Sequence, residues 1–305
     1  MSSTIVLNQS NIVNAENNTF VYKFPNSVHF PNHQIAIQSV SMYYSWQNIN
    51  SIPLDNNTLT ISYYSNDTLT TNTITIPNGL YEITDINNYF QYWSIQNGMY
   101  LIDSAGDYTY FFEIMVNPTY YAIQLNTFQI PISLPLGYTQ PDNWIGFPTT
   151  VYNPSITILS NFNNLIGFPS GFSTPLNSSV SLSYGSMNEE GSYAVLSSDF
   201  GLTPNVQPNS NVLFSVSNIN NKYAIPSSII YSLSPSVAIG SQIIEKPPQF
   251  SWNKLLAGTY HEIRLQLLGT DYKPLTILDK NMTILLVIRD IKDEISAFSS
   301  ILGGK

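Results

Sequence analysis

The residues of this chain that could carry out acid–base or metal chemistry are few and scattered. The 305 residues include three histidines and no cysteine. His29 and His33 have the four-residue spacing that brings two metal ligands together on a helix, but Pro31 between them predicts a bend. No third ligand lies nearby in the sequence. Without cysteine, a thiolate metal site, a cysteine nucleophile and a disulfide framework are excluded.

The late acidic residues do not form a convincing catalytic pair. His261 precedes Glu262 in a strand-like segment, so we expect the two side chains to point to opposite faces. Asp271 and Asp279 flank the segment between two late strands, where turn chemistry favours aspartate. Glycoside hydrolysis needs two carboxylates facing one cleft. A glycosidase built on a β-sandwich is therefore the least favoured of three functional hypotheses.

Two acidic clusters have the character of solvated surface. Glu189 and Glu190 precede a glycine in a sequence typical of a loop tip. Asp290, Asp293 and Glu294 alternate with basic residues, as at a solvated helix start. The chain contains no Gly-rich phosphate loop, nucleophile elbow or zinc motif. We therefore expect no catalytic residue, no cofactor-binding residue, no metal ligand and no bound cofactor, and we do not expect an enzyme.

Charge is scarce and unevenly distributed. The chain has 10 basic and 19 acidic residues, and charged residues make up 10% of it, against about 25% in a typical soluble domain. Lys23 is the only Lys or Arg before Lys222, so residues 1–221 carry a net charge of −11 and residues 222–305 carry +2. A nucleic-acid binder needs a basic face to displace counterions from phosphates. Sequence-specific nucleic-acid binding is therefore not expected.

Amides and hydroxyls take the place of the missing charges. The sequence has 34 Asn, 38 Ser and 23 Thr. An AT-rich gene would explain the Asn, but lysine also has AT-rich codons and is nearly absent from the first 221 residues. Uncharged polar groups cost less to desolvate than ions do. A surface of this composition suits packing against neighbouring proteins.

A period of two dominates the sequence and predicts half-buried β-strands. Asn117-Pro118 predicts a hairpin turn between two of these strands. Residues 34–43 and 282–288 carry apolar residues on both faces, so we expect these strands at the centre of a sheet or between two packed sheets. The alternating segments are 58–63, 73–76, 108–116, 121–125, 180–184, 212–216 and 262–267.

Two segments have helical spacing instead. In the first, apolar residues recur at steps of three and four: Leu80, Ile83, Ile86, Phe90 and Trp93. The second is the tail, 291–302, which Gly303 and Gly304 would end. The most apolar run, 284–288, is far shorter than the roughly 20 residues of a membrane span. The first residues lack the pattern of a signal peptide.

The pattern predicts an all-β fold, a sandwich or jelly roll of two packed antiparallel sheets. We find no repeat and no long linker, so we expect one domain, 1–305. The region from about 127 to 211 is rich in Pro, Gly, Asn and Ser and is expected to be an insertion of elaborated loops or an inserted β subdomain. One short internal helix and one short C-terminal helix complete the prediction.

Several blocks of sequence, taken in order, resemble the penton (minor capsid) proteins of virophages and of the related Polinton-type viruses and elements. The resemblance extends from about 18 to 290; it lies in the order of the blocks, and the region 170–211 carries little of it. The blocks are FVYKF (20–24), QIAIQSVSMYYSWQNI (34–49), TIPNGLYEITDIN (75–87), NNLIGF (163–168), NNKYAIPSSIIY (220–231), PQFSW (248–252) with GTY (258–260), and DKNMTILLVIR (279–289).

The resemblance implies a single jelly roll of two four-stranded sheets. It also implies a virion protein, assembled in the host cytoplasm, of which five copies close each icosahedral vertex beside double-jelly-roll major capsid proteins. Catalysis and cofactors are not implied. The alternative is a carbohydrate- or receptor-binding jelly-roll module that recognises a host receptor or glycan, since aromatic and amide-rich surfaces suit both.

The charge asymmetry adds an expectation about polarity within such a particle. We expect the cations from Lys222 to Lys305 to lie toward the inside of the shell or its capsid neighbours. The acidic, lysine-free stretch from 24 to 221 should supply most of the outer loops. The tail helix, 291–302, is too short to be stable alone, so we expect it to pack on its own barrel or on a neighbour.

Overall fold

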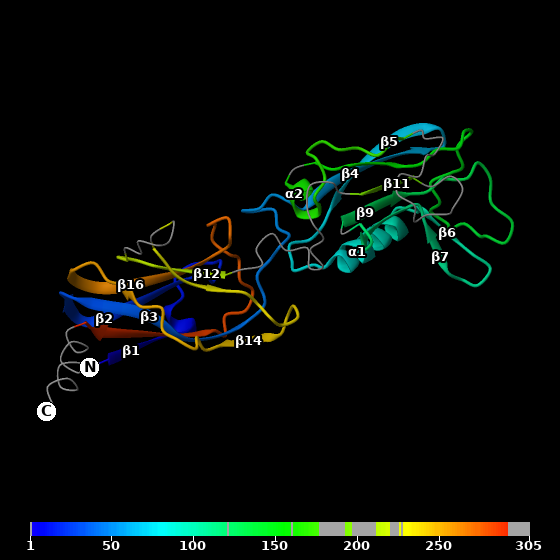
Figure 1. The fold of residues 1–305 in the computed structure, drawn as a ribbon. Coiled ribbons are helices and arrows are strands. Elements are labelled where there is room, and N and C mark those ends of the chain that lie inside the picture. Colours follow the sequence, from blue (N-terminus) through cyan, green and yellow to red (C-terminus); the bar gives the residue numbers. More distant parts are fainter. Residues whose placement is uncertain are drawn as a thin grey trace, which may run out of the picture. The chain divides into compact units, whose positions relative to one another are not determined.

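The computed structural model describes residues 2–120, 122–159, 161–176, 193–196, 212–219, 226 and 228–291. The fold is all-β apart from two α-helices and one 3-10 helix among these residues. The chain divides into two compact units. We call Met1–Gln47 with Asn209–Lys305 the jelly-roll unit, and Asn48–Pro208 the inserted unit (Figure 1).

The jelly-roll unit contains two antiparallel sheets of four principal strands each. The strand orders are β1-β17-β3-β14 and β13-β12-β16-β2, with the short β15 also paired to β3. Its elements are β1 (Ser2–Leu7), η1 (Gln9–Asn11), β2 (Thr19–Phe30), β3 (His33–Tyr43), β12 (Val212–Val216), β13 (Ile229–Leu233), β14 (Gln242–Glu245), β15 (Asn253–Lys254), β16 (Gly258–Leu268) and β17 (Thr283–Asp290).

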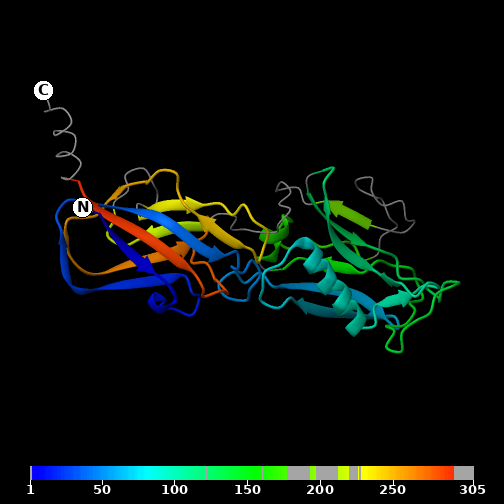
Figure 2. The ribbon, with the colours of Figure 1, turned by 90° about the horizontal axis from the view of Figure 1, so that it is seen from below.

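The strand order is that of a single jelly roll. Leaving the short β15 aside, the unit has eight strands. The first pairs with the eighth, the second with the seventh, the third with the sixth and the fourth with the fifth. This is one long hairpin rolled into two sheets, the arrangement of double Greek keys. Figure 2 shows the pair formed by the first and the last of these strands, the blue β1 beside the red β17. The expected fold class is confirmed.

The two strands with apolar residues on both faces lie inside a sheet, as expected. β17 lies between β1 and β3, and β3 lies between β17 and β14. Their core-facing residues, such as Ile35, Ile37, Leu286 and Ile288, are less than 5% exposed. The opposite sheet contributes Phe214 and other fully buried side chains to the same core. Alternation therefore places one face of each sheet inside the sandwich.

The inserted unit leaves the roll between its third and fourth strands and has its own hydrophobic core. Its sheets have the orders β10-β4-β5, β11-β9-β8 and β6-β7. Its elements are β4 (Thr58–Ser65), β5 (Thr68–Thr75), α1 (Ile83–Gln96), β6 (Tyr100–Ile102), β7 (Tyr108–Tyr110), β8 (Phe112–Asn117), β9 (Ala122–Thr127), β10 (Ser155–Thr157), α2 (Phe162–Ile166) and β11 (Tyr193–Leu196).

The expected internal helix is α1, and it begins at Ile83 rather than at Leu80. The backbone N–H of Glu82 donates to the Asp85 carboxylate at 2.9 Å, which satisfies one amide of the first turn. Phe90 on its apolar face packs against Phe112 of β8 with ring centroids 5.4 Å apart. The helix therefore covers the core side of the β8–β9 hairpin (Figure 1).

Two hairpins of the inserted unit, β8–β9 and β4–β5, follow from local sequence. The hairpin expected around Asn117-Pro118 is confirmed as β8–β9. The β4–β5 hairpin turns at Asn66 and Asp67, whose φ angles are +47° and +60°. Two positive φ angles in a two-residue loop define a type I′ turn, and Asn and Asp tolerate that conformation better than most residues.

The insertion differs from the expected one in extent. It was expected from about 127 to 211 within a single domain, but the inserted unit spans 48 to 208 and is a compact body with two helices. The strands between 58 and 127 have the same period of two as those of the jelly roll, so periodicity could not assign them to a separate core. Of the expected tail helix, residues 292–302 lie outside the described residues.

Truncating a core aromatic should destabilise one unit at a time, because each unit has its own core. Phe214 belongs to the core of the jelly-roll unit and Phe112 to that of the inserted unit, and neither is exposed. We expect Phe214→Ala to lower the free energy of unfolding of the jelly-roll unit by about 3–5 kcal/mol. Hydrogen exchange followed by mass spectrometry should show faster exchange in β2, β3, β16 and β17 and unchanged exchange in β4–β9.

The matched variant, Phe112→Ala, should give the reverse pattern. Equal acceleration in both units for either variant would contradict two separate cores.

Candidate functional site

The structure separates the two histidines that had metal-ligand spacing. His29 lies on β2 and His33 at the start of β3, on either side of the turn that connects the two sheets. His29 Nδ1 lies 3.2 Å from the Thr259 hydroxyl, while the His33 ring stacks edge-on against Phe30 at 4.9 Å. Within the described ranges, no group of three His, Cys, Asp or Glu side chains is placed to hold a metal.

His261 and Glu262 lie at a β-bulge rather than in a regular strand. The register of β16 against β2 shifts between Tyr260 and Glu262, so the simple alternation expected here does not hold. Between the paired positions, residues 24–27 of β2 lie opposite His261 alone, and Tyr260 and Ile263 are both buried although they are three residues apart. Glu262 Oε1 accepts a hydrogen bond of 2.7 Å from Arg264 Nε, so this carboxylate is held in an exposed ion pair.

The remaining acidic candidates serve turns or lie outside the described part. Asp271 accepts from the backbone N–H of Lys273, and Asp279 accepts from that of Asn281 at 2.8 Å, as expected for turn aspartates. Asp290 is the last residue of β17 and pairs in register with His33. Glu189, Glu190, Asp293 and Glu294 lie outside the described residues.

The sheet edges have an unusual composition. Among the outermost strands, β1, β13, β5 and β10 contain no charged residue, whereas β2 contains Lys23 and β8 contains Glu113. β14 has one, Glu245, which accepts a 3.0 Å hydrogen bond from the Tyr231 hydroxyl. Natural proteins usually protect such edges with charges, proline or bulges, because an unprotected edge offers unpaired backbone groups to another strand. Sequence reasoning missed this feature because strand composition becomes edge composition only once the sheet order is known.

One sheet of the inserted unit presents hydroxyl groups over most of one face. Most apolar residues of β10, β4 and β5 point into the core, and the opposite face carries Ser or Thr at eight positions, beside Tyr64 and the 52% exposed Leu69. Cross-strand pairs bond within this face, as between Ser62 and Thr71 (2.8 Å) and between Thr157 and Ser173 (2.7 Å). The eight positions are Thr58, Thr60, Ser62, Thr71, Thr73, Thr75, Ser155 and Thr157.

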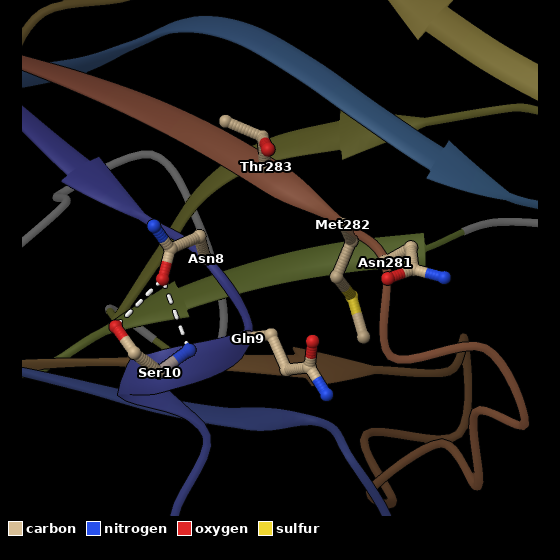
Figure 3. Close-up of a pocket in the computed structure, with 6 residues that line it drawn as sticks. All are labelled: Asn8, Gln9, Ser10, Asn281, Met282 and Thr283. Carbon is tan, nitrogen blue, oxygen red and sulfur yellow. Dashed lines mark hydrogen bonds between the residues drawn. The ribbon is translucent and has the colours of Figure 1, made fainter.

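The jelly-roll unit carries an open, uncharged pocket of about 470 Å³. It lies where the chain passes from β1 into η1 and where it enters β17 (Figure 3). The Asn8 side-chain oxygen accepts from the backbone N–H and the hydroxyl of Ser10, at 2.9 and 2.7 Å. The lining is polar but uncharged, apart from one thioether: Asn8, Gln9, Ser10, Asn281, Met282 and Thr283.

The charge asymmetry of the sequence follows the boundary between the units. The inserted unit has eleven acidic residues and no Lys, Arg or His, a net charge of −11. The jelly-roll unit has all ten cations and eight acidic residues, a net charge of +2. A body without cations is a poor partner for phosphates or other anions. Recognition by the inserted unit must therefore use amides, hydroxyls, aromatic rings or apolar side chains.

No helix among the described residues is both long and apolar enough to cross a bilayer.

No protein-family profile matches the chain, and no curated protein matches it. A search of solved structures finds the crystal structure of selenomethionine-labelled mavirus penton protein at a TM-score of 0.42 and 11% sequence identity. The match covers 95% of this chain and 98% of that one. This similarity is a distant structural relationship.

The pairing of Tyr231 with Glu245 should make stability fall at alkaline pH. Burial, followed by the hydrogen bond and the charge of Glu245, raises the pKa of Tyr231 from 10.0 to about 12. Between these two values the unfolded chain releases the proton and the folded chain retains it, so the free energy of unfolding falls as pH rises from about 10 to about 12. Urea titrations at a series of pH values should show a smaller fall for Tyr231→Phe.

The exposed Tyr272 provides the control, and Tyr272→Phe should retain the wild-type fall. A Tyr231→Phe protein with an unchanged alkaline slope would contradict the role of this pair.

Proposed function

We propose that this chain is a structural virion protein, a penton protein that forms pentamers at icosahedral vertices and contacts the major capsid protein. The observation that carries the proposal is the jelly-roll strand order combined with uncharged edge strands. The mavirus penton protein is too distant in structure to add weight to it. Neither catalysis nor a cofactor forms part of the proposed role.

The sequence resemblance supports the proposal because its blocks fall on the framework of both units. The early blocks lie on β2 and β3, and the last lies on β17, so they include the central strands of the roll. Two others lie at the end of β5 with the start of α1, and on α2. Blocks that follow one another over both units are what a shared architecture would produce.

The surface chemistry supports an assembly role over a catalytic one. A ring of five repeats one heterologous interface until the rotation closes. The same residues are then desolvated at all five interfaces of the ring, and a buried charge without a partner costs several kcal/mol at each. Hydroxyls, amides and unpaired strand edges instead gain hydrogen bonds on contact. The edges β1 and β14 of one sheet are therefore the surfaces we assign to contacts with neighbouring subunits.

A second candidate function is carbohydrate or receptor binding by the jelly roll. The pocket beside Asn8 and Asn281 favours it, because its volume lies in the range of small-ligand sites and its lining offers amide and hydroxyl groups. The two functions are compatible, since a vertex is exposed to the host. A glycan array that shows no binding at high protein concentration would remove this candidate.

Native mass spectrometry and electron microscopy, with and without the major capsid protein, test the vertex role. We expect pentamers, or their formation once the capsid partner is added. A protein that remains monomeric and never joins a shell would overturn the proposed function.

Charges placed on the two edges should weaken assembly without unfolding the chain. Thr4 on β1 is exposed, and Ile244 on β14 is 66% exposed. We expect Thr4→Lys and Ile244→Lys each to shift the population from pentamer toward monomer by at least tenfold, because five like charges would meet around one axis. Melting temperatures should stay within a few degrees of the wild type, since surface substitutions are usually small in effect.

Ser104→Lys, in the exposed loop between β6 and β7, is the matched control and should assemble as the wild type does. Normal pentamers from both edge variants would refute the assignment of these edges while leaving the vertex role to the wild-type test.

A further inference from the structure

The inserted unit projects an aliphatic loop whose two ends are fixed. Residues 131–138 lie between Ile130 and Thr139, both of which form β-bridges. The Ile130 N–H donates to the Tyr152 carbonyl at 2.9 Å. Thr139 and Ile102 exchange two backbone hydrogen bonds of 2.7 and 2.9 Å. The eight residues between these anchors therefore form a short loop that backbone hydrogen bonds hold at both ends.

A tight turn places leucine at the apex of this loop. The Tyr138 N–H donates to the Pro135 carbonyl at 3.2 Å, and Gly137 has a φ of +83°. A positive φ at the third position of a four-residue turn is typical of type II and requires glycine or a close substitute. Leu136, at the second position, is 102% exposed. Ile132 and Leu134 in the same loop are 52% and 42% exposed.

The neighbouring hairpin adds tyrosines at the base of this tip. Ile102 pairs with Tyr108 on one side and with Thr139 on the other, so Tyr108 lies on the same face of this small sheet as the loop anchor. Tyr108 is 47% exposed, and its ring lies 4.9 Å from that of Tyr100 and 6.4 Å from that of Tyr110. β6 and β7 lie at the opposite end of the inserted unit from α2 (Figure 1).

The loop and the residues that flank it are uncharged. Residues 129–140 contain no Asp, Glu, Lys, Arg or His. Two carboxylates, Asp103 and Asp107, lie in the turn of the adjoining β6–β7 hairpin, so the absence of charge is a property of the loop itself. An aliphatic apex on an uncharged loop, above a base of tyrosines, is the combination that partitions into the boundary between water and lipid tails, where tyrosine rings are enriched. We propose that residues 131–138 insert Leu136, with Ile132 and Leu134, into the surface of a neutral, zwitterionic lipid bilayer.

The small size of the loop and the charge of the inserted unit favour a neutral bilayer over a protein partner or an anionic membrane. A specific protein partner usually buries about 800 Å² on each side, which three side chains on one narrow loop do not provide, whereas a bilayer needs no shaped counterpart. The net charge of −11 on the inserted unit, without a single cation, disfavours anionic lipids. Attraction must therefore come from the apolar tip. The proposal stands independently of the vertex assembly.

Flotation of the full chain with phosphatidylcholine vesicles tests it. We expect binding that is unchanged between 0.05 and 0.5 M salt, about tenfold weaker for Leu136→Ser, and at least about a hundredfold weaker when Ile132 and Leu134 are also replaced by Ser. Vesicles that contain phosphatidylserine should bind no better. Leu278→Ser, which removes an aliphatic side chain of the jelly-roll unit that is 52% exposed, as Ile132 is, should bind as the wild type does.

Fluorescence provides a second readout, because the chain has no cysteine. An environment-sensitive dye on Leu136→Cys should shift to the blue on adding vesicles, and the same dye on Leu278→Cys should not. Absence of wild-type binding would overturn the proposal, as would equal loss of binding in the Leu278→Ser control or binding that needs anionic lipid. The proposal would also be overturned if the chain bound a protein receptor in a pulldown, lost that binding in Leu136→Ser, and did not bind vesicles.

Discussion

The pairing of β3 with β17 is the constraint on which the rest of the structure depends. It joins His33–Tyr43 to Thr283–Asp290, so almost the whole chain lies between the two partners. Closing so long a loop costs conformational entropy, but that cost grows slowly with length. Ile35, Ile37 and Leu286 become almost fully buried when this pair enters the sandwich, and burial of such side chains stabilises by roughly 1.5–3 kcal/mol each.

This rolled arrangement explains how the chain accommodates so large an insertion. The inserted unit leaves the roll after the third strand and returns before the fourth, so it interrupts no hairpin pair of strands. Its own core, with Phe90 of α1 against Phe112 of β8, does not require the jelly roll to bury it. The two sets of strands share a period of two but not a core, and variation in one need not disturb the other.

Local features could be predicted from the sequence, whereas long-range ones could not. The helix α1 could be predicted because a period of 3.6 residues is a local property of the sequence. Its apolar positions are Ile83, Ile86, Phe90 and Trp93. The central position of β3 also followed from its apolar faces. The strand order, the start of the insertion at residue 48 and the bulge at His261 depend on which strands meet in space. Alternation does not encode that choice, and the uncharged edges therefore became visible only in the structure.

The scarcity of charge can be interpreted physically once the two units are considered one at a time. Edges of the jelly-roll unit such as β1 and β13 offer backbone groups and hydroxyls, which lose little on desolvation and gain hydrogen bonds on contact. The inserted unit instead carries −11, and like charges on neighbouring copies repel within a Debye length of about 8 Å at physiological salt. This repulsion disfavours contacts between the inserted units of two copies and leaves contacts through the edges of the jelly-roll unit unaffected. Net negative charge confined to one unit therefore adds specificity to edges whose chemistry alone is permissive.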